Sequence, residues 1–267
     1  MDQNMNFIEV RPHRKLHLVH FDNKLKRTIF FLHGLGGRLD QFKAQIDYFK
    51  KNYNIVAADM LGHGDSQKPR ENANILYSFA ELYQDIQILF SDYQTEENFI
   101  VGHSYGGTFA TYLTFNNPDK IKKLVLMAPL PLNPQIAITK FFYLPIPLLE
   151  LIRPLVTKAF VKIAFDRHTD PALIQHEIEM TNKNPMFVIK ACTQGLLKLP
   201  SIAIDQIKTP TLIITGENDG LIPFSQINNF YQKLPHAEFI KIKNAAHLVM
   251  LEQPVKVNQL IEKFLSS

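Results

Sequence analysis

The sequence predicts an α/β fold, in which helices flank a mostly parallel sheet and a helical cap is inserted between two strands. Short runs rich in β-branched and aromatic residues alternate with longer helical patterns, which is typical of parallel strands joined by helices. From residue 130 to about residue 205 this alternation stops, prolines recur, and no run of comparable strand quality appears. We therefore expect one α/β core that carries a helical insertion.

Six strands are expected in chain order, and each is a short apolar run that ends near a glycine, a proline or a polar turn. The runs cover residues 27–34, 53–66 (a strand followed by a loop), 97–104, 122–129, 209–219 and 237–247. Residues 105–118 have a helical pattern that Asn-Asn-Pro closes. Residues 253–267 form an amphipathic helical pattern, with Pro254 near its start. Its apolar face consists of Val257, Leu260, Ile261 and Phe264.

These elements divide the chain into two parts. Residues 1–129 and 206–267 are expected to form the core domain, and residues 130–205 the helical cap, or lid. The cap segment is rich in Phe, Leu and Ile, with lysines and arginines interspersed. The sequence shows no internal repeat and no low-complexity segment, so a single core with one insertion accounts for its whole length.

The composition is that of a globular protein with a sizeable core, because 46% of the residues are hydrophobic and 20% are charged. The formal net charge is +4, but no dense Lys/Arg tract occurs, and we expect no nucleic-acid partner. The single cysteine, Cys192, cannot form an internal disulfide. The N-terminal segment lacks the pattern of a signal peptide, and the apolar run 141–149 is too short to cross a bilayer. We therefore expect a cytoplasmic protein.

The stretch Gly102-His103-Ser104-Tyr105-Gly106 follows one predicted strand and precedes a predicted helix. A serine on such a sharp turn has strained backbone geometry, and glycines two residues to either side relieve the steric clash. The turn places the serine oxygen at a helix N-terminus, where backbone N–H groups favour developing negative charge. In this context Ser104 is favoured as a catalytic nucleophile over a simple capping serine.

A serine hydroxyl needs a base to act as a nucleophile at neutral pH. His247 follows the last predicted strand and so falls at the carboxyl edge of the sheet, where catalytic groups of open parallel sheets collect. Asp219 follows the preceding strand and is the expected acid that orients this base. Glu217 and Asp205 compete for that role, but Glu217 is interpreted as part of a turn and Asp205 lies before the strand. Asp59 is interpreted as a loop-fixing residue that accepts backbone hydrogen bonds.

Acyl transfer also needs hydrogen-bond donors for the oxyanion. We expect one donor to be the backbone N–H of Tyr105 and the other to be the N–H of Leu35, in the turn HGLGG at residues 33–37. Glycines in that turn allow the backbone to approach a substrate closely. The turn lacks the Gly-Lys-Ser/Thr ending of a P-loop and the spacing of a dinucleotide-binding loop. No metal and no organic cofactor is expected.

The motifs HGLGG, DMLGHGDS, GHSYGG, GENDGLIP and NAAHLVMLEQP occur in the order and spacing of the α/β-hydrolase family. The sequence resembles that family over nearly its whole length, and GHSYG and HLVMLEQP are most similar to the abhydrolase-domain-containing proteins and their bacterial relatives. The resemblance implies a nucleophile, a base, its acidic partner and two oxyanion donors at Ser104, His247, Asp219, Leu35 and Tyr105, respectively.

Two features distinguish this sequence within the family. Many relatives carry tryptophan where this chain has Phe42, and this chain has no tryptophan at all. The dehalogenases and epoxide hydrolases of the family use aspartate at the turn that here carries Ser104, so the serine argues against both activities.

The expected activity is hydrolysis of carboxylic esters through an acyl-enzyme intermediate, with a small-molecule ester of a lipophilic acyl group as the ligand. Phe141, Phe142 and Leu148 are candidate substrate-binding residues in the apolar cap. Thioester hydrolysis (including depalmitoylation), C–C bond hydrolysis and aminopeptidase cleavage stay open, as does a slow-turnover ligand sensor or scaffold. Lysines in the cap also suggest weak contact with an anionic membrane surface. The sequence leaves the oligomeric state open.

Overall fold

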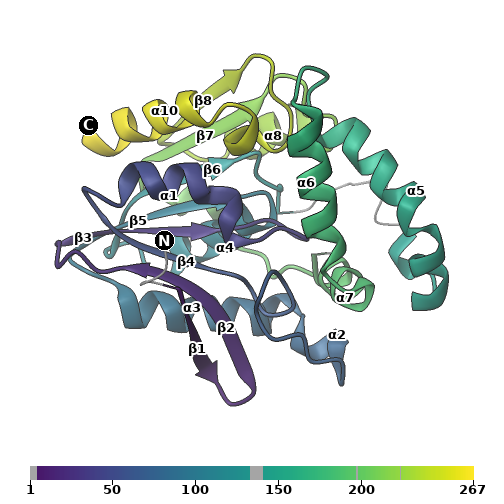
Figure 1. Ribbon diagram of the computed structural model, residues 1–267. Helices are drawn as coiled ribbons and strands as arrows, with labels where there is room; N and C mark the ends of the chain where they lie inside the picture. The colour runs from purple at the N-terminus through teal and green to yellow at the C-terminus, as the bar shows by residue number, and fades with distance from the viewer. Residues whose placement is uncertain (1–4, 133–140, 197, 223) are drawn as a thin grey trace.

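The computed structural model describes residues 5–132, 141–196, 198–222 and 224–267. In this part of the chain one eight-stranded sheet forms the centre of the molecule, in the order β1-β2-β4-β3-β5-β6-β7-β8 (Figure 1). The strands are β1 (Met5–Arg11), β2 (Arg14–Phe21), β3 (Arg27–Leu32), β4 (Asn54–Ala58), β5 (Glu97–His103), β6 (Ile121–Met127), β7 (Thr211–Gly216) and β8 (Ala237–Ile242).

The strands from β4 to β8 in this order run parallel to one another, whereas β1 pairs antiparallel with β2 and β2 antiparallel with β4. All six strands predicted from the sequence are present, and the prediction of a mostly parallel sheet is confirmed. The antiparallel edge formed by β1 and β2 is the part of the sheet that the sequence analysis did not specify.

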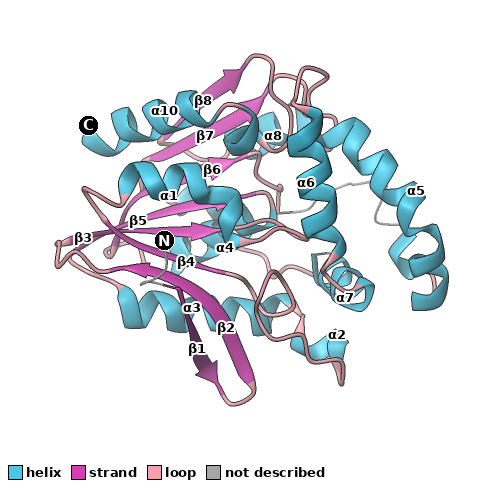
Figure 2. Ribbon diagram, viewed as in Figure 1, coloured by secondary structure: helices cyan, strands magenta, loops and turns pink. Residues whose placement is uncertain are grey.

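Helices cover both faces of this sheet (Figure 2). The side chains of β3 alternate between the two faces, because Ile29 and Phe31 pack in one apolar core and Phe30 and Leu32 in the other. The first core contains α1 (Lys43–Phe49) and α10 (Pro254–Ser266), and the second contains α3 (Phe79–Tyr93) and α4 (Tyr105–Asn116). The shorter elements are η1 (Leu39–Phe42), α2 (Ala73–Leu76), η3 (Ile204–Gln206), α8 (Phe224–Tyr231) and α9 (Val249–Glu252).

Among the described residues between β6 and β7, three α-helices lie together on one side of the sheet in Figure 2: α5 (Ile146–Ala164), α6 (Pro171–Asn182) and α7 (Met186–Leu196). We call them the insertion helices. They fall within the segment for which a cap is predicted, and the division of the chain at residues 129/130 and 205/206 stays a prediction. Within the described residues, no helix is both long enough and apolar enough to cross a membrane.

Candidate active site

Ser104 occupies the sharp turn between β5 and α4, with a φ of 51° and a ψ of −116°. A positive φ is unusual for a residue with a side chain, and such strain concentrates at functional sites. The neighbouring glycines permit it. A Cβ atom on Gly106 would lie 2.0 Å from the Leu32 carbonyl oxygen, and one on Gly102 would lie 2.6 Å from the Gly106 oxygen. The steric reason predicted for the two glycines is therefore found in the structure.

His247 lies between Ser104 and Asp219. Its Nε2 is 3.0 Å from Ser104 Oγ, and its Nδ1 is 2.9 Å from Asp219 Oδ2. In the tautomer that satisfies both contacts, Nδ1–H donates to the carboxylate and Nε2 accepts from the serine hydroxyl. All three side chains are buried. The structure thus brings together the three residues that the sequence analysis selected from three distant segments.

The Asp219 carboxylate is held in its charged form. Burial alone would raise the pKa of Asp219, but the charge and hydrogen bond of His247 act against it, and the net effect is a lowered pKa. The other carboxylate oxygen accepts the backbone N–H groups of Leu221 at 2.9 Å and Ile222 at 3.1 Å. An ionised, fixed carboxylate beside Nδ1 holds the imidazole in the orientation that leaves Nε2 free to accept a proton.

The loop that carries His247 is fixed from several sides. The backbone N–H of His247 donates to the Ala164 carbonyl at the end of α5. The His103 ring donates through Nε2 to the His247 carbonyl at 3.0 Å. Burial and the neighbouring His247 lower the pKa of His103 to about 3, so its ring stays neutral at ordinary pH. Glu252 accepts the N–H of Ala246 at 2.6 Å through its second carboxylate oxygen.

Glu252 also reaches the insertion helices, a role that the sequence analysis missed. Its first carboxylate oxygen accepts the backbone N–H of Asp166 and the hydroxyl of Thr169, each at 2.6 Å. One side chain therefore ties the loop of His247 to the segment between α5 and α6. The only sequence signal was its place in the run HLVMLEQP, five residues after the expected base.

The competing carboxylates lie elsewhere. Glu217 and Asp205 are exposed, and neither hydrogen-bonds to His247. Asp59 is buried and accepts the backbone N–H groups of Leu39 at 2.7 Å and Asp65 at 2.9 Å. The loop-fixing interpretation of Asp59 therefore agrees with its contacts.

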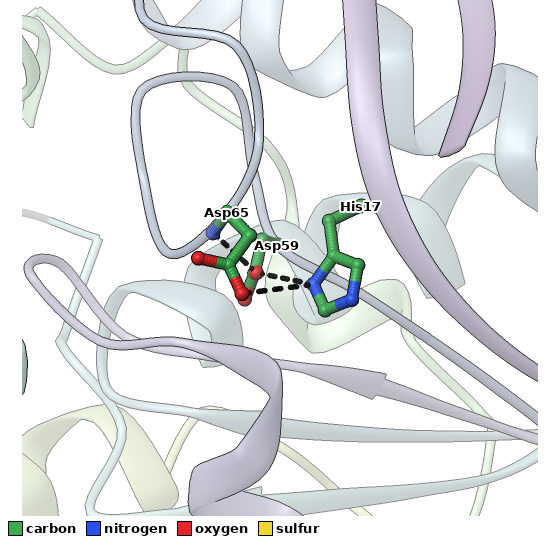
Figure 3. A group of neighbouring side chains, drawn as sticks. All are labelled: His17, Asp59 and Asp65. Carbon is green, nitrogen blue, oxygen red and sulfur yellow. Dashed lines mark hydrogen bonds and ion pairs between the residues drawn. The ribbon is translucent and has the colours of Figure 1, made fainter. Parts of the chain in front are cut away.

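Asp59 also accepts the Nδ1–H of His17 at 2.8 Å (Figure 3). This hydrogen bond is the main cause of a raised pKa at His17. His17, Asp59 and the exposed Asp65 each offer one atom of a type that binds metal ions, and these three atoms lie within 4.8 Å of one another. Both Asp59 oxygens accept hydrogen bonds from the protein, and these contacts are sufficient to explain why the side chains lie together.

A cavity of about 190 Å³ opens at Ser104 and His247. Its walls are mostly apolar and come from the core and from the insertion helices. Glu177 of α6 is an exception, because it is an acidic residue that is buried (6% exposed), and its carboxylate accepts a 2.8 Å hydrogen bond from Gln41. Burial raises the pKa of Glu177. The apolar lining from the insertion helices includes Val156, Phe160, Ile178, Met186 and Ile189.

Of the three candidate substrate-binding residues, one lines the cavity and two do not. Phe142 is buried and lines the cavity. Phe141 and Leu148 do not line it and are 49% and 40% exposed, so the structure does not place them in the pocket. Adjacent positions in a turn, and opposite sides of one helix, point in different directions, and residue type alone does not separate them.

Leu35, the other expected oxyanion donor, lines the same cavity as Ser104. Its turn is closed by the N–H of Gly37, which donates to the Gly34 carbonyl, and Gly36 has a φ of 74°. Tyr105 is the first residue of α4, so its N–H has no acceptor within the helix. The assignment of these two N–H groups as oxyanion donors remains a proposal.

Comparisons with known proteins agree with this architecture. The model of the family described as serine aminopeptidase, S33, matches residues 23–254. Mouse protein ABHD8 is 30% identical over 272 residues, which cover 96% of this chain but only 61% of ABHD8. A Bacillus subtilis protein named uncharacterized hydrolase YugF is 24% identical over 92% of both chains. The esterase EaEST from Exiguobacterium antarcticum matches with a TM-score of 0.84 and 18% identity, over 98% of this chain and 99% of its own, which shows a shared fold.

Proposed function

The chain belongs to the serine aminopeptidase S33 family of α/β-hydrolases, and from this premise we propose that it hydrolyses carboxylic esters with a lipophilic acyl group. One observation carries the proposal. The hydrogen-bonded chain from Ser104 through His247 to Asp219 ends in a cavity whose walls are mostly apolar. A nucleophile, a base and an apolar binding space are the parts that acyl-ester hydrolysis requires.

The proposed reaction has two steps. His247 Nε2 takes the proton of Ser104 Oγ as this oxygen attacks the ester carbonyl carbon, and the N–H groups of Leu35 and Tyr105 stabilise the oxyanion. The C–O bond to the alcohol then breaks, and His247 returns the proton to the leaving oxygen. Water, deprotonated by the same histidine, attacks the acyl-enzyme, releases the acid and restores the serine. These steps need neither a metal nor an organic cofactor.

A second candidate function is suggested by Glu177. It is a buried acid on an otherwise largely apolar wall, and a buried carboxylate is a suitable partner for a substrate amine. Cleavage of an amino-terminal residue would use the same serine chemistry, with the amine held by Glu177. The name of the matching family agrees with this alternative. We keep the ester hydrolase as the first proposal because the rest of the described cavity wall is mainly apolar.

Turnover of p-nitrophenyl esters from acetate to palmitate tests the proposal, with wild type and Ser104→Ala measured together. Activity that peaks at one chain length and is lost in the variant supports it, and the expected loss is on the order of 10⁴–10⁶ in turnover. Aminoacyl p-nitroanilides form the second panel. Turnover of these amides with none of the esters would replace the first proposal by the second. A folded protein that neither turns over an ester nor reacts with a fluorophosphonate would overturn both.

The cellular location is also a proposal. Cys192 is buried as a free thiol, which agrees with the cytoplasmic location expected from the sequence. Fractionation of cells that express the full-length natural protein would test it, since enrichment outside the cytoplasmic fraction would contradict this placement.

A further inference from the structure

Several exposed hydrophobic residues lie close together in the chain, at the beginning of α5 and just before it. We call this group the outer patch. Such side chains, when clustered, mark interaction surfaces, whereas single exposed residues elsewhere need no explanation. The outer patch consists of Phe141 (49% exposed), Tyr143 (65%), Leu148 (40%), Leu151 (76%) and Leu155 (70%).

The helical period explains why the outer patch is continuous on α5. Leu148, Leu151 and Leu155 are three and four residues apart, so they lie on one side of the helix. The opposite side, with Arg153 and Phe160, lines the cavity that contains Ser104. Helix α5 therefore stands between this cavity and the outside of the molecule, where it forms the right-hand edge in Figure 1.

Basic residues extend the same side of α5. Lys158 and Lys162 are exposed and continue the spacing of the three leucines by three and four residues. The only acid of this helix, Glu150, lies on a different side and pairs with Arg153 at 3.3 Å. An apolar stripe that continues into lysines along one side of a helix is typical of helices that lie in the plane of a membrane surface.

We propose that the outer patch of α5 docks on the surface of a bilayer that contains anionic lipids. The leucines enter the region between the headgroups and the acyl chains, and Lys158 and Lys162 lie against the lipid phosphates. A second copy of this chain is a poorer occupant, because a two-fold contact through this face would gather the lysines of both copies in one interface. Binding of lipid requires no catalysis, so the inference stands apart from the proposed function.

Docking has a consequence for the site. The last turn of α5 is bonded to both loops that carry the partners of Ser104, because the Ile163 carbonyl accepts the N–H of Gly220 and the Ala164 carbonyl accepts the N–H of His247. The helix proposed to meet the bilayer is therefore hydrogen-bonded to the loops that carry Asp219 and His247. A lipophilic ester dissolved in the bilayer would meet the protein at this helix.

Co-sedimentation with vesicles tests the inference directly, with phosphatidylcholine alone or mixed with phosphatidylserine. Ser104→Ala serves as the background, so that hydrolysis cannot alter the vesicles. We expect salt-dependent binding to the mixed vesicles. The double variant L151S/L155S should bind at least tenfold more weakly, while the matched control I75S/V255S, at residues that are 64% and 68% exposed, should bind unchanged.

The charge is tested separately. K158E/K162E should lose most of the preference for phosphatidylserine, since each lysine near an anionic surface contributes about fivefold to binding. The control K51E/K256E makes the same change in net charge at exposed lysines outside α5. If K158E/K162E and K51E/K256E lose vesicle binding equally, or if the Ser104→Ala protein does not sediment with the mixed vesicles at low salt, the inference is overturned. A dimer by light scattering that L151S/L155S dissociates, without vesicle binding, would assign the patch to a second copy instead.

Discussion

Replacement of Glu252 by alanine should both destabilise the protein and slow the proposed reaction. Its carboxylate accepts hydrogen bonds from Ala246, Asp166 and Thr169, and these three partners lie in the loop of His247 and in the segment between α5 and α6. The substitution removes all three acceptor contacts at once. It leaves two backbone N–H groups without their acceptor.

The magnitude follows from these contacts. A hydrogen bond to a charged group contributes about 1.5–3 kcal/mol, and water can partly replace it at a half-buried position, so a loss of about 3 kcal/mol in unfolding free energy is expected. For a protein of this size each kcal/mol corresponds to about 2–4 °C, so the midpoint of thermal unfolding should fall by about 6–12 °C. Because the base loses one of its supports, kcat should also fall, by about 10- to 100-fold.

Thermal unfolding followed by circular dichroism measures the first effect without any assumption about the substrate. Ester turnover, if present, measures the second. Glu262→Ala is the matched control, because Glu262 is an exposed acid whose described hydrogen bond is with the Tyr48 hydroxyl. If the unfolding midpoint of Glu252→Ala equals that of the control and its kcat stays within twofold of wild type, Glu252 does not support the loop as described.

Three further predictions concern other parts of the site. Gly106→Ala should fail to fold or should lose more than about 3 kcal/mol in unfolding free energy, because its Cβ would meet the Leu32 carbonyl. Gly107→Ala, whose Cβ would have its nearest neighbour at 3.3 Å, should be less destabilising in urea unfolding, and equal effects of the two substitutions would contradict the close approach at Gly106. Asp219 has a lowered pKa in the folded state, so it stabilises the protein above its ordinary value of 3.8 and this contribution disappears as pH falls through the folded-state value. Asp219→Asn should therefore flatten the acid limb of a plot of unfolding midpoint against pH, and an unchanged limb would refute the assignment. Glu177 has a raised pKa, so its ionisation costs stability as pH rises above 4.5; Glu177→Gln should be more stable than wild type at pH 7 and lose that advantage at low pH, and a variant less stable at pH 7 would contradict this sign.

The parts of the site that the sequence predicted are those with a local pattern. Ser104 lies in a five-residue motif whose two glycines avoid a steric clash at the turn. The structure shows this clash, because a Cβ atom at either glycine would lie too close to a backbone oxygen. Asp219 and His247 follow two predicted strands, and the parallel sheet brings the carboxyl ends of such strands to one edge. Pattern and topology together were sufficient for these three residues.

The parts that escaped prediction depend on tertiary contacts. Glu252 lies within a helix of four residues, and its role comes from two loops that approach it from distant positions in the chain. Phe141 and Phe142 are identical in type and adjacent, yet one is half exposed and the other lines the cavity. The direction of a side chain in an insertion is decided by what the insertion packs on, and the sequence alone does not contain that information.

A second group of serine, histidine and aspartate in this protein shows why residue types do not define a catalytic site. Ser66, His17 and Asp59 are buried and close together, and the His17–Asp59 hydrogen bond of 2.8 Å matches the 2.9 Å between His247 and Asp219. Here, however, the Ser66 hydroxyl donates to the Asp59 backbone carbonyl at 2.6 Å, and Ser66 Oγ also accepts the backbone N–H of His17. Its proton and its acceptor capacity serve the backbone instead of the imidazole.

The two serines differ in the hydrogen bonds that their hydroxyl groups make. Ser104 Oγ faces the base and a cavity, and the positive φ of its turn keeps it there. Ser66 is held in a loop where both of its hydrogen-bonding functions are used. Activity is therefore expected from Ser104 alone, and Ser66→Ala should lower stability by about 1–3 kcal/mol while leaving the reaction of Ser104 with a fluorophosphonate intact. Loss of that labelling in a folded Ser66→Ala protein would show that the two groups are coupled, which the separate hydrogen bonds of the structure do not predict.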